Sequence, residues 1–426
     1  MANKVRTKRA KSRTLKGLNV SPGDPARTLL RIVSSAQPIS RVDLARRLKV
    51  TRGTVTEIVK PLLAADVLCE AAPDAGGRVG RPPIGLSFQS NRAFLIGINI
   101  GVRRSQVGLA TPDGRLHHEE SFDTPADQTA ALALIRSGMD RLRALMPDRL
   151  PAAIGVSVPG PTDAERTRLL FAPHLGWRDV EIARELAIPK GRRLRQADNV
   201  APVIVENDAT AAAMYEVQHR FRDRAPREGN DFVLVRVGTG IGVGLVLGGE
   251  VSRGSGPDGG LLGEFGHMTI VAGGKQCPCG NRGCWERYAS ASSAAMLYAG
   301  DRPKVRGQEP PRFMEIVARA EAGERRARST LERIGEYLGV GVSNVISGLG
   351  VSSVVVNGRI VYGWKFIEQS LRQAVAGSMA GRLAKWSIEP GEPTGSGLGG
   401  AIEVATDHYL TTLAGARLKR PAVLKR

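Results

Sequence analysis

The sequence predicts an α/β protein with two structural parts, a small helical domain followed by a much larger body of two lobes. Apolar residues recur at helical spacing between residues 24 and 68, which indicates three short helices. Further along, a strand, Gly-rich turn, strand pattern occurs twice, at 93–122 and 231–251, and suggests a duplicated α/β half. At 426 residues the chain is too long for one ordinary domain, and its 42% hydrophobic content excludes wholesale disorder.

Four segments are predicted: a basic flexible arm at 1–20, a winged helix-turn-helix domain at 21–90, a body at 91–415 and a basic tail at 416–426. Residues 1–90 contain 17 basic and six acidic side chains, so they carry +11 of the net charge of +20. A genome of high GC content would enrich arginine along the whole chain, which leaves the cause of the remaining +9 open. It does not explain the clustering at one end, and this clustering favours a nucleic-acid partner.

The chain has no apolar run of the roughly 18 to 20 residues that a membrane-spanning helix needs. Its basic start also lacks the apolar stretch of a secretory signal. We therefore expect a cytoplasmic, nucleoid-associated protein with no membrane partner.

The first domain has clear start and stop signals. Ser40 with Asp43 forms a capping box at the second helix, and Thr51 stands just before the third. Pro61 cannot donate a backbone hydrogen bond, so we expect the third helix to end or bend there. A Gly-rich turn and the alternating apolar residues of 84–88 then predict a hairpin, or wing.

The two helices within 39–63 are separated by about three residues, which is the helix-turn-helix spacing. The residues expected to face DNA lie at the start and along the second of these two helices, which is the third helix of the domain, and on the wing. They are Thr51, Arg52, Thr54, Thr56 and Lys60 for the helix, and Arg78 and Arg81 for the wing. We expect Arg52 and Thr54 to reach base edges in the major groove. The wing resembles an AT-hook core, except that Val79 stands where that hook has Arg, and its arginines suit a minor groove. The alternative is a small protein-interaction domain with solvated arginines.

The second part begins near Ala93 with three predicted strands and an amphipathic helix from about 126 to 146, and long helical stretches follow at 313–337 and 364–376. A cleft between the two lobes is the expected ligand site. Asn207 and Asp208 stand between an apolar strand and an Ala-rich helix, where Asp208 could simply be the helix N-cap.

Three of the four cysteines, Cys277, Cys279 and Cys284, lie within eight residues, and His267 precedes them. This spacing in a cytosolic chain favours a metal site over disulfides, and three thiolates with one imidazole predict structural Zn²⁺ with no open position. The alternative is a trio of reduced, buried cysteines.

Several motifs together resemble the ROK family of repressors, open reading frames and kinases, and the helix-turn-helix matches its repressor branch. They are GVSVPGP (155–161), PHLGW (173–177), VENDATAAAMYE (205–216), GTGIGVGLVLGGEVSRG (238–254), GEFGHM (263–268) and CPCGNRGCWERYAS (277–290). The resemblance covers residues 93 to about 410 and implies a two-lobed, actin-like and hexokinase-like ATPase fold.

The same resemblance implies a sugar site. Its expected residues are Asn207, Asp208, Glu264, His267 and Glu286, together with His174, which stands where the family commonly has Asn. In the family's kinases the residue matching Asp208 is the general base. Without the motif spacing, Glu286 would be as easily read as a solvated surface residue.

On the nucleotide side, the family's kinases carry an Asp-x-Gly-Gly-Thr-Lys type loop, where this chain has Asn99-Ile100-Gly101-Val102-Arg103-Arg104. A later Gly-Gly signature reads Asn357-Gly358, whereas the loop 238–242 is intact. We therefore expect no catalytic residue, with Asp208 as a vestigial base. Arg103 and Arg104 remain able to hold an anion.

The favoured hypothesis is a sugar-responsive transcriptional regulator, a repressor, that binds operator DNA as a homodimer or homotetramer and binds a monosaccharide or derivative without phosphorylating it. One alternative is an ATP-dependent hexose or N-acetylhexosamine kinase that retains a DNA-binding domain. Another is a regulator that senses a partner protein, such as a transporter subunit, in place of a sugar.

Overall fold

The computed structural model describes residues 25–71, 84–89, 93–147, 149–188, 201–223, 231–254, 261–300 and 310–418. The predicted basic arm, the wing arginines Arg78 and Arg81, and all but the start of the predicted basic tail lie outside these ranges. No helix within them is long and apolar enough to cross a membrane.

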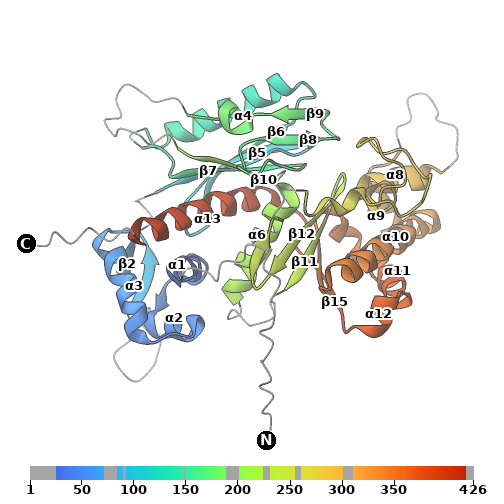
Figure 1. The fold of residues 1–426 in the computed structure, drawn as a ribbon. Coiled ribbons are helices and arrows are strands. Elements are labelled where there is room, and N and C mark those ends of the chain that lie inside the picture. Colours follow the sequence, from blue (N-terminus) through green and yellow to red (C-terminus); the bar gives the residue numbers. More distant parts are fainter. Residues whose placement is uncertain are drawn as a thin grey trace, which may run out of the picture.

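The N-terminal domain, here called the head, contains three helices and a small sheet (Figure 1). Its elements are α1 (Pro25–Ala36), β1 (Ile39–Ser40), α2 (Arg41–Leu48), α3 (Arg52–Ala64), β2 (Leu68–Ala71) and β3 (Gly85–Phe88), with strand order β1-β3-β2. Both expected N-caps are confirmed, because the Ser40 and Thr51 hydroxyls accept hydrogen bonds from the backbone N–H groups of Asp43 and Thr54. Helix α3 ends near Pro61, as expected: Pro61 lies in its last turn, and the helix ends at Ala64.

The N-terminal lobe of the body is built on a five-stranded sheet of order β10-β7-β4-β5-β6. Its elements are β4 (Leu95–Asn99), β5 (Arg104–Ala110), β6 (Leu116–Asp123), α4 (Gln128–Ala144), β7 (Ala153–Val158), β8 (Leu169–Ala172), β9 (Trp177–Val180), α5 (Ile182–Glu185), β10 (Val203–Asn207) and α6 (Asp208–Asp223). The three strands and the helix expected at its start are confirmed.

The C-terminal lobe repeats this plan with strand order β13-β12-β11-β14-β15. Its elements are β11 (Phe232–Val237), β12 (Ile241–Leu247), β13 (Glu250–Ser252), η1 (Glu264–His267), α7 (Glu286–Ala289), α8 (Ala291–Ala299), α9 (Phe313–Glu321), α10 (Arg325–Leu349), β14 (Ser353–Asn357), η2 (Arg359–Gly363), α11 (Trp364–Gly377), α12 (Met379–Leu383), β15 (Ser387–Pro390) and α13 (Ser396–Leu418). In both sheets three antiparallel strands are followed by two parallel ones, as a duplicated half predicts. The helical stretch expected around 313–337 is confirmed as two helices, α9 and α10, which are separated where Gly323 adopts a φ of +93°.

Helix α13 joins all three parts of the chain. It lies across the face of the N-terminal sheet opposite α4, packs against α6, and ends against the head (Figure 1). At 23 residues it is about 35 Å long. Its Leu410 is buried in the same apolar cluster as Leu29, Val33 and Val55, so the core of the head is completed by a helix of the body.

Candidate functional site

A cleft of about 330 Å³ lies between the two lobes. All six residues predicted for sugar binding line it: His174, Asn207, Asp208, Glu264, His267 and Glu286. Residues from the first hairpin of the body and the loop 238–242 line the same cleft. The structure therefore brings together segments more than a hundred positions apart in the chain.

Asn207 and Asp208 occupy the junction of β10 and α6. The Asn207 Oδ1 atom accepts hydrogen bonds from the backbone N–H groups of Ala209 (2.9 Å) and Thr210 (3.2 Å), and its Nδ2 atom donates to the Gly160 carbonyl at 3.2 Å. Asn207 is therefore the side chain that caps the helix, and Asp208 is not. The Asp208 carboxylate is left for other partners.

Arg236 on β11 is the partner of Asp208. Its Nε atom donates to Asp208 Oδ2 at 3.2 Å, and its Nη1 atom donates to Ser396 Oγ at 2.8 Å. A guanidinium at this distance competes with a substrate hydroxyl for the carboxylate that a kinase would use as base. Sequence reasoning missed Arg236; the available signal was an arginine within the apolar strand FVLVRV, directly before the Gly-rich loop.

The remaining sugar-side residues form a compact cluster of two carboxylates and two imidazoles. Glu286 is 3% exposed. Its Oε1 atom lies 3.2 Å from His174 Nε2 and 3.8 Å from His267 Nδ1. Burial alone would raise the pKa of Glu286, but the hydrogen bond with His174 and the nearby His267 hold it below its usual value. Burial and the carboxylates of Asp208 and Glu286 raise the pKa of Glu264 to about 7.

The loop 238–242 approaches this cluster so closely that it needs glycine. A Cβ atom at Gly240 would lie 2.4 Å from a carboxylate oxygen of Glu286 and 3.1 Å from His174 Nε2. A Cβ atom added at Gly238, in contrast, would have no neighbouring atom within 4 Å. The loop therefore has an open position at Gly238 and, at Gly240, a position where any side chain would displace the sugar-side cluster.

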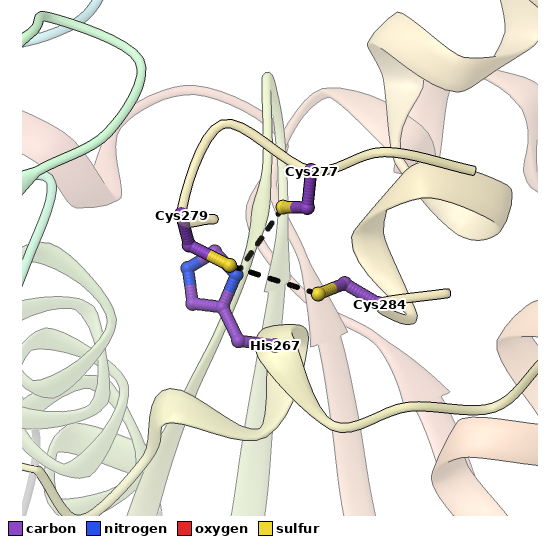
Figure 2. A group of neighbouring side chains, drawn as sticks. All are labelled: His267, Cys277, Cys279 and Cys284. Atoms are coloured by element: carbon purple, nitrogen blue, oxygen red, sulfur yellow. Dashed lines mark hydrogen bonds between the residues drawn. The ribbon is translucent and has the colours of Figure 1, made fainter. Parts of the chain in front are cut away.

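The four predicted metal ligands converge. Figure 2 shows the side chains of His267, Cys277, Cys279 and Cys284 pointing toward one another, and their ligand atoms all lie within 4.8 Å of each other. His267 turns Nδ1 toward Cys277 Sγ (3.6 Å) and Nε2 toward Glu264 (3.8 Å). Three sulfurs and one imidazole nitrogen in this arrangement fit a tetrahedral zinc site, with the second imidazole nitrogen facing the cleft.

The nucleotide-side positions are also at the cleft. Asn99 donates from Nδ2 to Gln106 Oε1 at 2.9 Å, and Val102, Arg103 and Arg104 follow it along the cleft wall. Asn357 is fully buried, and its Oδ1 atom accepts a hydrogen bond from Ser396 Oγ at 2.9 Å. Both Asn side chains are thus engaged within the protein.

The predicted DNA-facing side chains of α3 lie on one exposed surface. Thr51, Arg52, Thr54, Thr56 and Lys60 are all exposed. The opposite face of the helix is buried through Val55, Val59 and Leu62. This division leaves the basic and hydroxyl side chains available to a partner.

A charge network that sequence reasoning did not anticipate fastens the head to the body. Arg27 of α1 lies 2.6 Å from Asp407 of α13, and Arg31 lies 2.7 Å from Glu250 of β13. Behind them, Arg253 Nε donates at 2.6 Å to the carboxylate of Glu206, which also pairs with Arg166 at 3.0 Å. Glu206 directly precedes the Asn207-Asp208 pair of the cleft.

Comparison with known proteins identifies the class of this two-lobed fold. Residues 95–407 match the ROK family, and the chain belongs to that family. It is 28% identical over 353 residues to the xylose repressor of Bacillus spizizenii, covering 82% of this chain and 85% of the relative.

Two solved structures resemble the fold. A ROK family transcriptional regulator that is a homologue of the E. coli MLC protein aligns with a TM-score of 0.69 and 23% identity, over 92% of this chain and 98% of that one. A ROK family glucokinase from Streptomyces griseus, in complex with glucose and AMPPNP, aligns with a TM-score of 0.60 and 25% identity, over 74% and 99%. The two-lobed fold expected from the family resemblance is thereby confirmed.

Proposed function

We propose that the protein is a sugar-responsive transcriptional repressor whose head binds operator DNA as a winged helix-turn-helix and whose cleft binds a monosaccharide or derivative. The observation that carries the proposal is the division of the cleft. All six residues predicted for sugar binding line the cleft, whereas the position of the expected Mg²⁺-supporting carboxylate holds Asn99 and the vestigial base Asp208 is paired with Arg236. The name of the Bacillus spizizenii relative, a xylose repressor, supports the same conclusion.

Sugar recognition is assigned to the carboxylates and imidazoles of the cluster. Glu264 and Glu286 accept hydrogen bonds from sugar hydroxyls, and the cleft-facing nitrogens of His174 and His267 complete the pattern of donors and acceptors. Asn207 contributes its remaining amide hydrogen, since its other groups hold α6 in place. A zinc ion held by His267 and the three cysteines would fix the loop 264–286 and the orientation of this imidazole.

Helix α13 and the charge network are the proposed route from the cleft to the head. The start of α13 contacts the cleft through Ser396, which bonds to Arg236, while its far end supplies Asp407 and Leu410 to the head. A sugar that changes the closure of the lobes would shift this helix relative to the head. A coupling of about 1 to 3 kcal/mol, or roughly five- to 150-fold in operator affinity, suffices for regulation.

The proposed partners are operator DNA and a sugar. Arg52 and Thr54 would read base edges, while Thr51, Thr56, Lys60 and the wing residues Arg78 and Arg81 contact the backbone or minor groove. A homodimer or homotetramer would present two heads to a palindromic operator, and action on DNA places the protein in the cytoplasm at the nucleoid. A transporter subunit is the alternative effector.

The deciding experiment is footprinting of the full-length protein on the promoter region of its own gene, with and without a panel of monosaccharides. We expect a protected site whose affinity falls steeply with salt and changes with one sugar. Absence of any protected site at low salt would refute the DNA-binding function. Protection that no sugar alters, with no sugar binding by calorimetry, would favour the transporter-subunit alternative.

The alternative of an active hexose or N-acetylhexosamine kinase is tested separately. We expect no sugar-dependent ADP release with ATP and Mg²⁺, because Asn99 cannot replace the carboxylate that supports Mg²⁺ in the family's kinases. Brisk release with any hexose would overturn this expectation. An Arg236→Ala variant serves as a second test. It frees Asp208 from its ion pair but does not restore the missing carboxylate, so it too should release no ADP.

A further inference from the structure

Two arginines, Arg103 and Arg359, line the nucleotide side of the cleft, and a third, Arg312, lies close enough for its charge to act on Arg103. Arg103 follows β4 in the N-terminal lobe, whereas Arg359 and Arg312 belong to the C-terminal lobe, at the start of η2 and directly before α9. Arg103 and Arg359 both line the cleft, and all three side chains are exposed. Within the described ranges, none of these three guanidiniums has an acidic side chain within ion-pair distance. We refer to Arg103, Arg312 and Arg359 as the arginine triad.

The three charges act on one another across the two lobes. Burial and the positive charges of Arg359 and Arg312 lower the pKa of Arg103. The carboxylates of the cleft do not relieve this repulsion. Asp208 is paired with Arg236, and Glu264 and Glu286 face His267 at the sugar side.

Uncompensated guanidiniums that converge in a cleft favour an anion and repel a divalent cation. Arginine binds phosphate through two parallel N–H groups. The loop 238–242 lines the same cleft, and its Gly238 position leaves room beside the arginines. One side of the cleft is therefore suited to an anionic group, and the other side is suited to hydroxyl groups.

The size and composition of the cleft favour one ligand that spans both halves. A volume of about 330 Å³ is at the small end for ligand sites and suits a single small molecule. A nucleoside triphosphate would bring Mg²⁺ with it. Asn99 replaces the carboxylate that would support this cation, and the three unpaired arginines would repel it. A monosaccharide that carries its own phosphate needs no metal.

We propose that the arginine triad binds the phosphate group of a phosphorylated monosaccharide, without magnesium, while the sugar ring contacts the Glu264 and Glu286 cluster. This inference rests on the proposed sugar-sensing function and names the chemical class of its effector. The bound phosphate connects Arg103 of one lobe with Arg312 and Arg359 of the other, so that it closes the cleft.

The test is isothermal titration calorimetry of the full-length protein in magnesium-free chloride buffer at constant ionic strength. The ligands are inorganic phosphate, glucose, glucose 6-phosphate and ADP. We expect inorganic phosphate to bind, and Arg103→Ala and Arg359→Ala each to weaken it by about tenfold or more, the usual size of a charge-assisted hydrogen bond. Arg103→Lys should recover part of the affinity, because it keeps the charge but not the planar fork.

Arg382→Ala is the matched control, because Arg382 is exposed in the same lobe and lies outside the cleft lining. It should bind phosphate as the unmodified chain does. The triad variants should also keep their ligand-free melting temperature, since each removes a repulsive charge and breaks no side-chain hydrogen bond or ion pair within the part of the chain that the structure describes. A lowered melting temperature together with weaker binding would indicate a structural role and count against the proposal.

The outcomes separate the sources of phosphate. Tighter binding of glucose 6-phosphate than of glucose, inorganic phosphate or ADP supports the proposal. Tighter binding of ADP assigns the triad to a nucleotide and overturns it, as does equal phosphate binding by the triad variants and the control. If free sugars release operator DNA and a phosphate group on the sugar does not strengthen the effect, only this inference fails. If neither free nor phosphorylated sugars alter DNA binding, the proposed function fails. In that case the titration with inorganic phosphate still tests whether the triad binds an anion.

Discussion

Asp407 is the residue whose replacement tests the link between head and body. Its Oδ1 atom lies 2.6 Å from Arg27, and the two side chains are 14% and 25% exposed. Burial alone would raise the pKa of Asp407, but Arg31 and Arg27 hold it below its ordinary value of 3.8. The substitution Asp407→Asn keeps the shape of the side chain and removes the charge.

The expected cost is about 3 kcal/mol of docking free energy. Breaking a buried ion pair costs about 3 to 5 kcal/mol and an exposed pair at most about 1, and this pair is mostly but not fully buried. A loss of about 3 kcal/mol corresponds to roughly 150-fold more opening of the head. Hydrogen exchange of the amides of α1 measures that opening directly.

Two further readouts isolate the effect. All four tryptophans lie in the body, so tryptophan fluorescence follows the unfolding of the body alone and should change little. The control is Asp140→Asn, whose exposed pair with Arg143 lies within α4 and is expected to contribute less than about 0.5 kcal/mol. If exchange of α1 in Asp407→Asn stays within about threefold of the unmodified chain, the ion pair does not hold the head and the reasoning fails.

The pH dependence has a definite sign. Because the folded pKa of Asp407 is below 3.8, its contribution is fully present above about pH 4 and is lost as the pH falls through the folded value. The difference between the unmodified chain and Asp407→Asn should therefore be constant from about pH 8 to about pH 5 and shrink only in stronger acid. A difference that shrinks near neutral pH would point to another group.

Three other predictions concern the glycine loop, the metal cluster and the DNA-facing helix. Gly240→Ala should weaken sugar binding by about tenfold or more in calorimetry, because its Cβ atom would enter the sugar-side cluster, whereas Gly238→Ala should have little effect; equal effects would contradict the packing argument. Cys279→Ser should lower the zinc content, measured by atomic emission, and abolish the sugar response while operator binding persists, with Cys69→Ser as the control outside the cluster; a full sugar response without zinc would refute the bracing role. Arg52→Ala should lose about 1 to 3 kcal/mol of discrimination against mismatched operators in anisotropy titrations, and uniform weakening on all sequences would place this side chain on phosphate instead.

The parts of the structure that sequence predicted well are governed by local rules. The caps at Ser40 and Thr51 follow from residue type and position, and the first hairpin of the body follows from alternating hydrophobicity. The metal cluster was also readable, because three cysteines within eight residues have few other uses. Each of these signals lies within a short window of the chain.

The parts that sequence reasoning missed depend on long-range contacts. The sequence left open whether Asp208 is a helix N-cap; in the structure Asn207 Oδ1 caps α6, and its Nδ2 atom donates to the carbonyl of Gly160, which is distant in the sequence. Arg236 stands out as a charge within an apolar strand, but only the fold shows that its partner is Asp208, 28 residues earlier in the chain.

The shared core of the head has a practical consequence for dissecting this protein. Because Leu410 completes the apolar cluster of α1 and α3, a fragment cut at the apparent domain boundary near residue 90 would leave that cluster open to water. Removing the chain from Asp407 onward would do the same from the other side and would also remove the nearer of the two carboxylates that pair with Arg27, leaving only Glu250 at 3.5 Å. Chimeras that transplant the head onto another regulator therefore need the final turns of α13 as well. The smallest transferable unit combines residues from the two ends of the chain.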